Sequence, residues 1–292
     1  GMPGFHPGCG RLERRPSRSI RPMLYVFAAA LATAAGCAPR AATRVDAGPL
    51  RLVSTAPNLT EIVFALGAAG CLVGRTESCD YPPACAAVPA VGGFGTPNLE
   101  PLLAARPTLV LETVLADPEI ARRLAALRIP VAHIDCARLD DIPDAILAVG
   151  RLVGRDARAY ALAADIRDGL AAARAAPAPA RRTRVAMLFA ADSPITAGRR
   201  SFIAELLRIA GAENIGDSSN ADYYRVSLEW LLAQDPDVLL CLFETAGREP
   251  VDLFAAQTGW NALSAVRARR VYTVTDLNTV CRPGPRVLEG IA

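Results

Sequence analysis

Short runs of aliphatic residues alternate with longer amphipathic segments from residue 50 to the end of the chain. The short runs are typical of buried strands in a parallel sheet, and apolar residues spaced three or four apart are typical of helices. Strands are predicted at 52–54, 71–74, 108–111, 131–134 and 184–189. Helices are predicted from Thr60, after Asn98, and at 117–127, 142–153, 156–176 and 201–209. This alternation predicts an α/β fold.

The second half of the chain repeats features of the first half in the same order. The segment at 99–107 matches the segment at 228–236, and in both a glutamate stands seven positions before a proline. A strand that ends in aspartate recurs near Asp135 and Asp276. A helix that ends in glycine recurs before Gly67 and Gly211. These repeats predict two similar lobes.

The two lobes are expected at 50–154 and 178–292. Between them lies the alanine-rich segment 155–177, and a helix of this length spans roughly 30 Å at about 1.5 Å per residue. The prolines at 177 and 179 end the predicted helix. The fold expected is therefore two Rossmann-like lobes joined by one long helix, with the ligand site in the cleft between them.

The N-terminal segment resembles an export signal. Residues 1–36 combine arginines, an apolar run too short to span a bilayer, and small residues directly before Cys37. Those small residues resemble a bacterial lipobox, with Ala34 where leucine is usual. We therefore expect removal of 1–36, lipidation of Cys37 and a tether over 37–49. Cleavage by an ordinary signal peptidase and a start at Met23 are the alternatives.

The charge of the chain argues against a nucleic-acid partner. The formal net charge is +3, but residues 1–36 carry +4, so the rest of the chain carries −1. Binding of nucleic acid draws on many uncompensated cations. The chain contains no lysine, which excludes a P-loop lysine and a Schiff-base lysine.

Few residues suit catalysis or metal binding. Beyond the N-terminal segment the only histidine is His133, inside an apolar strand pattern, where a structural role is favoured. The motifs of hydrolases and zinc proteases are missing from the sequence. Cys79 and Cys85 flank an Asp-Tyr-Pro-Pro turn and an exported protein can oxidise them, but spacing alone assigns no pairing. We therefore expect no enzyme, no metal site and no cofactor.

Aromatic residues in loops favour a binding function instead. Phe94 lies in a run of glycines, and Tyr223 and Tyr224 precede the repeated segment of the second lobe. Each is either an exposed platform for a large flat ligand or a residue packed against its own loop. Glu100 and Glu229 hold matching positions in the first turns of two helices, where a carboxylate suits the helix dipole. They could equally form a two-point dock for a cationic partner.

Several of these segments together resemble a known family. CDYPP, VGGF with PNLE, SFI followed by AGAENI, RVSLEWLLA and the closing RPGPR are similar to segments of periplasmic cobalamin-binding proteins. More broadly they resemble the substrate-binding proteins of ABC importers for cobalamin, haem and ferric siderophores. The resemblance covers about residues 51–292. It implies two lobes joined by a backbone helix, with the ligand held between them.

The resemblance also implies roles for individual residues. Ligand contacts are expected from Ser78, Asp80, Tyr81, Phe94, Gly95, Tyr223, Asn278 and Arg282. Ser78 stands where cobalamin binders carry an aromatic. Glu100 and Glu229 match the glutamates with which the family docks on arginines of the permease dimer.

The sequence therefore predicts a monomeric, periplasmic or envelope-located receptor, anchored to the membrane through Cys37. Its expected ligand is cobalamin or a related corrinoid, and its expected partner is a permease with its ATPase. A haem or ferric siderophore receptor is the alternative within the family. An extracytoplasmic hydrolase is disfavoured because no nucleophile and base can be paired.

Overall fold

The computed structural model describes residues 48–113 and 117–291 of the chain. The first lobe is built from β1 (Leu52–Ser54), α1 (Pro57–Ala65), η1 (Ala69–Cys71), β2 (Leu72–Gly74), η2 (Pro83–Ala87), β3 (Gly92–Gly93), β4 (Thr96–Pro97), α2 (Leu99–Ala104), β5 (Leu109–Glu112), α3 (Pro118–Ala126), β6 (Val131–His133) and α4 (Asp141–Val153). The long helix α5 (Asp156–Ala175) follows.

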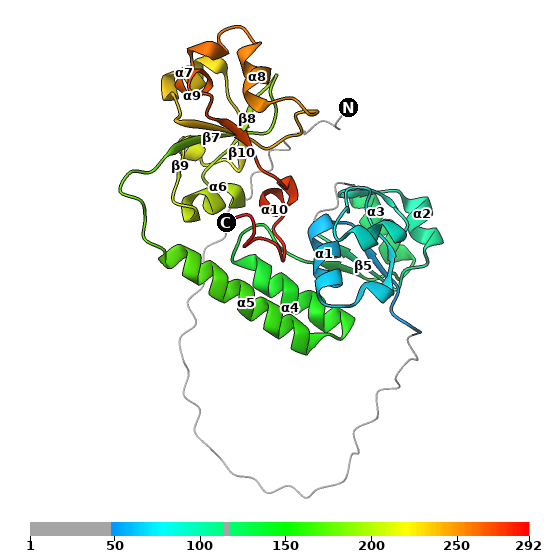
Figure 1. Cartoon of the computed structure of the whole chain (residues 1–292). Helices are drawn as coiled ribbons and strands as arrows, with labels where there is room; N and C mark the ends of the chain where they lie inside the picture. The colour runs from blue at the N-terminus through cyan, green and yellow to red at the C-terminus, as the bar shows by residue number, and fades with distance from the viewer. Residues whose placement is uncertain (1–47, 114–116, 292) are drawn as a thin grey trace, which may run out of the picture. The chain divides into compact units, whose positions relative to one another are not determined.

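The second lobe contains β7 (Arg184–Leu188), β8 (Ile195–Ala197), α6 (Phe202–Ile209), β9 (Glu213–Asn214), η3 (Ile215–Ser218), β10 (Tyr223–Arg225), α7 (Leu228–Gln234), β11 (Val238–Cys241), α8 (Pro250–Ala255), η4 (Trp260–Ala262), α9 (Ser264–Arg267), β12 (Val271–Thr273) and α10 (Leu277–Cys281). Figure 1 shows both sets of elements. The α/β fold predicted from the sequence is confirmed.

Each lobe is organised around one parallel sheet of four strands. The first sheet has the order β2-β1-β5-β6, and the second has the order β9-β7-β11-β12. All neighbouring strands within these sheets pair in parallel. In both lobes the first strand of the sheet lies between the second and the third. The predicted repeat is therefore confirmed as a repeat of topology.

The repeat extends to the backbone at matching helix ends. Gly67 and Gly211 follow α1 and α6 with φ values of 67° and 83°. This left-handed conformation is the usual way to end a helix, and it favours glycine. Arg106 and Asp235, which follow α2 and α7, also have positive φ, at 47° and 36°. Matching residues thus end matching helices.

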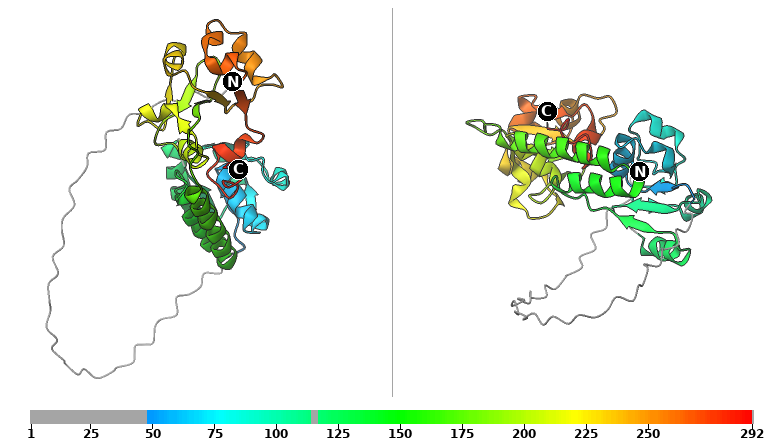
Figure 2. Two further views of the ribbon diagram at one scale, coloured as in Figure 1. Left: turned by 60° about the vertical axis from the view of Figure 1, so that its left-hand side comes forward. Right: turned by 90° about the horizontal axis from the view of Figure 1, so that it is seen from below.

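The helix α5 packs along α4, as Figures 1 and 2 show from three directions. Its buried residues are Ala159, Ala163, Ile166 and Leu170, and their spacing forms one helical stripe. A Cβ atom at Gly150 of α4 would lie 2.3 Å from the Cβ atom of Ala159. The helices can approach this closely only because position 150 lacks a side chain. The predicted long helix is confirmed with nearly its predicted bounds.

One hydrophobic core connects α5 to both lobes. The cluster contains Leu52 and Ile62 of the first lobe, Ile166 of α5, and Met187 and Leu206 of the second lobe. Each of these side chains is at most 3% exposed. Fully burying an aliphatic side chain contributes roughly 1.5–3 kcal/mol. The lobes therefore share a packed core rather than a flexible linker.

Many element boundaries differ from the sequence prediction by about one residue, and two of the starts differ for a clear local reason. Helix α1 begins at Pro57 rather than near Thr60, because proline is well suited to the first turn of a helix. Strand β2 begins at Leu72 rather than Cys71, because Ala69–Cys71 forms a 3-10 turn. Neither difference moves a predicted site residue.

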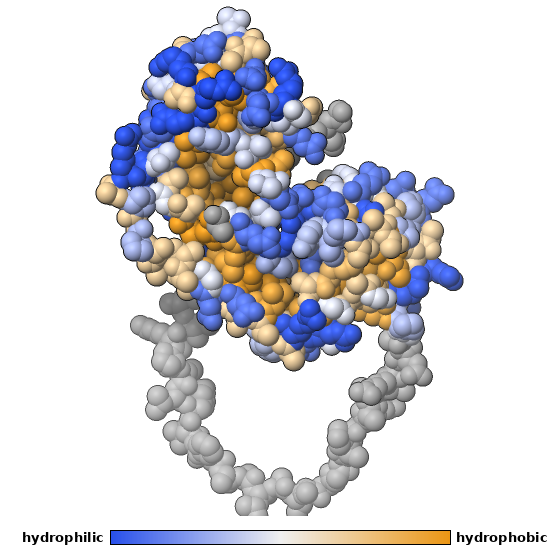
Figure 3. Space-filling model, in the orientation of Figure 1, coloured by the Kyte–Doolittle hydropathy of each residue, from blue (hydrophilic) through white to orange (hydrophobic). Residues whose placement is uncertain are grey.

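Apolar surface is unevenly spread on the face shown in Figure 3. Hydrophobic residues gather over α5 and beside α6, and hydrophilic residues are frequent over α7 and α8. Among the described residues, no helix combines the length and apolar character needed to cross a bilayer.

Candidate functional site

A pocket of about 300 Å³ opens at the carboxyl ends of the strands of the first sheet. Pro57 and Asn58 follow β1, Thr113 follows β5, and Cys136 lies just beyond β6. Ligands of open α/β sheets bind at this edge, because the strand-to-helix loops meet there. The full lining is Pro57, Asn58, Ser78, Phe94, Thr113, Cys136, Cys281, Arg282 and Pro283. Its composition is largely apolar with a few polar groups, as is usual for small-molecule sites.

Phe94 is the large exposed side chain of this lining. It stands in the turn between β3 and β4 and is 50% exposed. Gly95, with φ at 65°, completes the turn, and its backbone N–H donates to the carbonyl oxygen of Thr55 at 3.4 Å. The turn is therefore tied to the sheet edge while its aromatic ring points away from the core. The exposed alternative predicted for Phe94 is the one that the structure shows.

The second lobe closes the pocket with the segment that follows β12. Residues 276–286, here termed the C-terminal segment, contain α10 and supply Cys281, Arg282 and Pro283 to the lining. The carbonyl oxygen of Pro283 accepts hydrogen bonds from Asn58 Nδ2 and from Cys136 Sγ, each at 3.2 Å. Both donors belong to the first lobe. The pocket wall is therefore held together across the two lobes.

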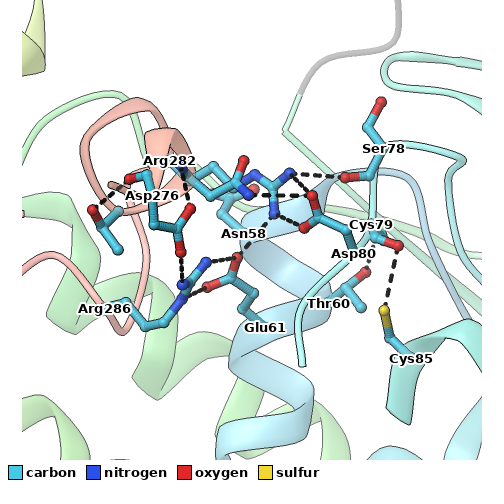
Figure 4. Close-up of polar contacts among 12 residues, drawn as sticks. Asn58, Thr60, Glu61, Ser78, Cys79, Asp80, Cys85, Asp276, Arg282 and Arg286 are labelled. Carbon is cyan, nitrogen blue, oxygen red and sulfur yellow. Dashed lines mark hydrogen bonds and ion pairs between the residues drawn. The ribbon is translucent and has the colours of Figure 1, made fainter. Parts of the chain in front are cut away.

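An ion-pair network lies directly beside the pocket (Figure 4). Glu61 of α1 accepts from Arg286 Nε and Nη2 at 3.1 Å each, and from Arg282 Nη1 at 3.1 Å. Arg282 also donates to Asp80 at 2.6 Å, and Arg286 donates to Asp276 at 2.6 Å. The Glu61 side chain is 3% exposed and that of Arg286 is 9% exposed. Here termed the Glu61 network, it joins three carboxylates to two guanidinium groups.

The network sets the charge states of its members. Burial alone would raise the pKa of Asp80, but the hydrogen bonds and charge of Arg282 outweigh it and hold the pKa below its usual value. Burial of Asp276 is likewise outweighed by Arg286, which lowers the pKa of that carboxyl. Burial disfavours the charge of Arg282, but Asp80 and Glu61 raise its pKa overall. All these groups are therefore ionised near neutral pH.

These shifts predict a loss of stability in acid. An aspartate whose folded pKa lies below its unfolded value of about 3.9 stabilises the fold fully above that pH and loses this contribution as pH falls further. We expect the melting temperature to fall below about pH 4. The double change Asp80→Asn and Asp276→Asn should lower the melting temperature at pH 6 and flatten the acid-induced fall. Circular dichroism melts from pH 6 to 2.5 measure this, with Asp168→Asn on the surface of α5 as the control. If the melting temperature fell equally steeply with pH in the wild type, the double variant and the control, the lowered pKa values of Asp80 and Asp276 would be contradicted.

A protein-family model described as periplasmic binding protein matches residues 52–276. The chain belongs to this family. Its members are substrate-binding proteins of ABC transporters rather than enzymes, and their name gives the periplasm as their location.

The names of several relatives of this periplasmic binding protein refer to vitamin B12 or to haem. It is 28% identical to the vitamin B12-binding protein of Pectobacterium carotovorum over 84% of this chain and 87% of that protein. The solved structure of an apo periplasmic haem-binding protein from Roseiflexus is similar with a TM-score of 0.75 and 30% identity, over 84% of this chain and 95% of that one. The solved structure of the vitamin B12-binding protein of Vibrio cholerae is similar with a TM-score of 0.69 and 26% identity, over 82% of this chain and 93% of that one. The two-lobed fold predicted from the sequence is thereby confirmed.

Six of the eight residues predicted to contact the ligand fall into two groups in this periplasmic binding protein, and the other two, Gly95 and Tyr223, are outside the pocket lining. Ser78, Phe94 and Arg282 line the pocket. Asp80 and Asn278 contact each other instead, with Asn278 Nδ2 donating to Asp80 at 3.2 Å. Tyr81 lies under Arg286, whose guanidinium carbon is 3.7 Å from the ring centroid. Asp80, Tyr81 and Asn278 therefore support the pocket wall, and the ligand contacts of both groups stay predictions.

Tyr223 of the second lobe lies near Cys281, a residue of the pocket lining. It is 40% exposed on β10, and its ring meets that of Phe189 edge-on with centroids 5.2 Å apart. Burial, with a smaller contribution from the nearby Cys281 thiol, raises the pKa of Tyr223 to about 12. The phenol is therefore neutral at physiological pH. Tyr224 is instead half-buried and donates to the carbonyl oxygen of Gly216 at 3.1 Å.

The described cysteines are all free thiols. The Cys85 thiol donates to the carbonyl oxygen of Cys79 at 3.3 Å, and the Cys79 sulfur lies 3.2 Å from the hydroxyl of Thr60. The two pocket thiols are protonated, because burial raises the pKa of Cys136 to about 12 and that of Cys281 to about 11. Among residues 48–113 and 117–291, no group of three potential ligands is arranged to hold a metal ion.

His133 is the last residue of β6, as its strand pattern predicts, but its side chain is exposed rather than buried among apolar residues. Its Nδ1 atom is 2.7 Å from a carboxylate oxygen of Glu112, the last residue of the neighbouring strand β5. The second carboxylate oxygen of Glu112 is buried without a described partner. The pair lies on adjacent strand ends, and neither residue belongs to the pocket lining.

Glu100 and Glu229 are both exposed in the first turns of α2 and α7. Each helix start is capped, by Asn98 in the first lobe and by Ser227 in the second. A hydrogen bond from Ser227 and the backbone N–H of Glu229 lower the pKa of the Glu229 carboxyl. Neither glutamate forms an ion pair among the described residues, so both carboxylates are available to a partner. Cys37 and the predicted signal and tether lie outside the described residues.

Sequence reasoning missed Glu61, Asp276 and Arg286 as members of the site. Signals exist for two of them. Glu61 is a buried acidic residue directly before the apolar run Ile62, Val63 and Phe64 in α1, and Arg286 closes the RPGPR motif. A carboxylate in such a helix needs a buried partner.

Proposed function

We propose that this periplasmic binding protein binds cobalamin or a related corrinoid in the pocket bordered by Phe94 and Arg282. The observation that carries the proposal is the similarity to vitamin B12-binding proteins over most of both chains. It combines with an exposed aromatic ring at a largely apolar pocket. A flat macrocycle stacks favourably on such a ring. Asn58, Ser78 and Arg282 offer hydrogen bonds to polar groups around its rim.

The side chains of the pocket favour a corrinoid over haem. Haem iron takes its axial ligand from histidine, cysteine, methionine or tyrosine. The described lining contains no histidine, methionine or tyrosine, and its candidates are the thiols of Cys136 and Cys281. A corrinoid can carry its own axial ligands and needs none of these. The haem-binding relatives nevertheless make haem the second candidate.

A ferric siderophore is less suited to this site. Such ligands commonly present anionic oxygens, which need free cations. Arg282 is the cation of the described lining, and it is already paired with Asp80 and Glu61.

Titration of the purified protein with aquocobalamin, haem and a ferric siderophore tests this choice. We expect saturable corrinoid binding at micromolar concentration or below, followed by calorimetry and visible absorbance. Phe94→Ala should weaken it roughly tenfold, since an aromatic contact contributes about 0.5–1.5 kcal/mol beyond the area it buries. Tyr160→Ala, on exposed α5, is the control and should have no effect. Tight haem binding without corrinoid binding would replace the proposal by the second candidate.

We further propose that the bound ligand is handed to a permease dimer through Glu100 and Glu229. The exposed positions of both carboxylates at matching helix starts support two equivalent contacts. A lipidated Cys37 and the tether 37–49 would keep the monomeric protein at the membrane after removal of 1–36. The domain limits 50–154, 155–177 and 178–292 belong to the same proposal.

A further inference from the structure

The Glu61 network reaches the pocket wall from residues that do not line the pocket. Arg282 and Ser78 are lining residues, but Glu61, Asp276 and Arg286 are not. Glu61 Oε1 lies 3.1 Å from both Arg282 Nη1 and Arg286 Nη2. One carboxylate oxygen therefore connects a pocket residue to an arginine behind the wall.

We propose that Asp276, Arg286 and Glu61 form a positioning relay that sets the orientation of Arg282 and of the wall segment 78–81. Ligand affinity then depends on three side chains that never touch the ligand. The inference rests on the proposed function, because it names residues that control the same pocket.

The wall segment is held at three of its four residues, Ser78, Asp80 and Tyr81. Arg282 Nη2 donates to the carbonyl oxygen of Ser78 at 2.9 Å and to Asp80 at 3.2 Å. Arg286 stacks on the ring of Tyr81 at 3.7 Å, a cation–π contact. Arg282 thus contacts the segment at Ser78 and Asp80, and Arg286 contacts it at Tyr81. Both guanidinium groups are hydrogen-bonded to Glu61 (Figure 4). A rotation of either guanidinium would displace the wall.

The charges explain why Asp276 belongs to the relay. Glu61 is shared by two guanidinium groups, and each of them has a second carboxylate, Asp80 for Arg282 and Asp276 for Arg286. Asp276 lies 2.6 Å from Arg286 Nη1 and gives that arginine a carboxylate that it does not share with Arg282. Without Asp276, Glu61 would be the remaining ion-pair partner of Arg286 among the described residues. Arg286 would then compete more strongly with Arg282 for Glu61.

Asp276→Asn is the variant that tests the relay. The amide can still accept the helix-capping hydrogen bond that Asp276 Oδ1 receives from the Asn278 backbone at 2.9 Å, so α10 keeps its start. We expect affinity for aquocobalamin to fall roughly fivefold or more, at the lower end of couplings between distinct sites. Amide hydrogen exchange of residues 78–81 should accelerate in the ligand-free protein. Asp276→Glu should restore both values toward the wild type.

Asp217→Asn is the matched control, because Asp217 pairs with Arg208 at 3.0 Å in a partly buried contact away from the pocket. It should lower stability without changing affinity or the exchange of 78–81. Arg286→Lys is the second variant should Asp276→Asn fail to fold, with the same expected results. Unchanged affinity and exchange, or equal losses in the control, would overturn the relay.

The same experiment separates the relay from the proposed function. If the wild-type protein binds no corrinoid, the proposed ligand is wrong, and the exchange of 78–81 still decides the relay. If the wild type binds corrinoid and the variants exchange and bind as it does, the relay alone is wrong.

Discussion

Replacing Glu100 and Glu229 together with arginine is expected to abolish uptake of the ligand by cells and to leave the affinity of the purified protein unchanged. Both carboxylates are exposed at helix starts and lie outside the pocket lining. In the proposed docking each meets an arginine of the permease. Like charges brought together at an interface cost several kcal/mol, and about 1.4 kcal/mol is a tenfold change in affinity. Two reversed contacts should therefore prevent productive docking.

Uptake of labelled cobalamin by cells and calorimetry on the purified variants measure the two effects separately. Each single replacement should reduce uptake partially. Glu249→Arg is the control, because Glu249 is an exposed acid directly before α8 and outside the proposed contacts. Loss of ligand affinity in the double variant would instead place the glutamates in the pocket or the core. Normal uptake by cells that carry the double variant would contradict the proposed docking.

Replacing Glu61 with leucine is expected to lower the free energy of unfolding by about 3–5 kcal/mol, as removal of one partner from a buried ion pair does. Glu61 is the shared acceptor of Arg282 and Arg286, and both arginine side chains are at most 14% exposed. The buried Nε and Nη2 groups of Arg286 would lose the acceptor that the structure gives them, and the remaining carboxylates, Asp80 and Asp276, are both partly exposed. Urea unfolding followed by circular dichroism measures the loss.

The double variant Glu61→Leu with Arg286→Met distinguishes a lost ion pair from a packing defect. Removing both charges together should recover part of the stability, because apolar residues often replace buried pairs at little cost. A double-mutant cycle completed with Arg286→Met isolates the coupling energy. If Glu61→Leu lowered the free energy of unfolding by less than about 1 kcal/mol, the Glu61 network would contribute no more than a surface ion pair. That result would contradict its assignment as a buried network.

Much of the fold could be predicted because it depends on local patterns. Strand β1 spans 52–54 as predicted, and α5 ends at Ala175, directly before the predicted end at 176. Asn98 caps α2 as expected, with its side chain accepting from the Glu100 backbone at 3.1 Å. Capping, apolar spacing and proline placement act over a few residues, so they can be recognised in the sequence. The repeat of the two lobes could be recognised for the same reason.

The candidate site could be predicted only in part. The resemblance pointed to Phe94 and Arg282, and the structure places both in the pocket lining. It also pointed to Asp80 and Asn278, which the structure pairs with each other. Spacing along the chain carries no information on whether two polar side chains face a ligand or one another, since that depends on how loops from both lobes converge.

The sequence by itself determined an α/β chain of two similar lobes joined by one long helix. It also determined that two helices begin with matching glutamates and that the residues present suit binding rather than catalysis. Only the tertiary structure decided that Glu61 and Arg286, which are 225 positions apart, share a buried hydrogen-bonded pair. Nothing in either residue's neighbourhood along the chain encodes its partner. The pairing follows from the packing of the C-terminal segment against α1, where a buried carboxylate must find a cation because water cannot solvate it.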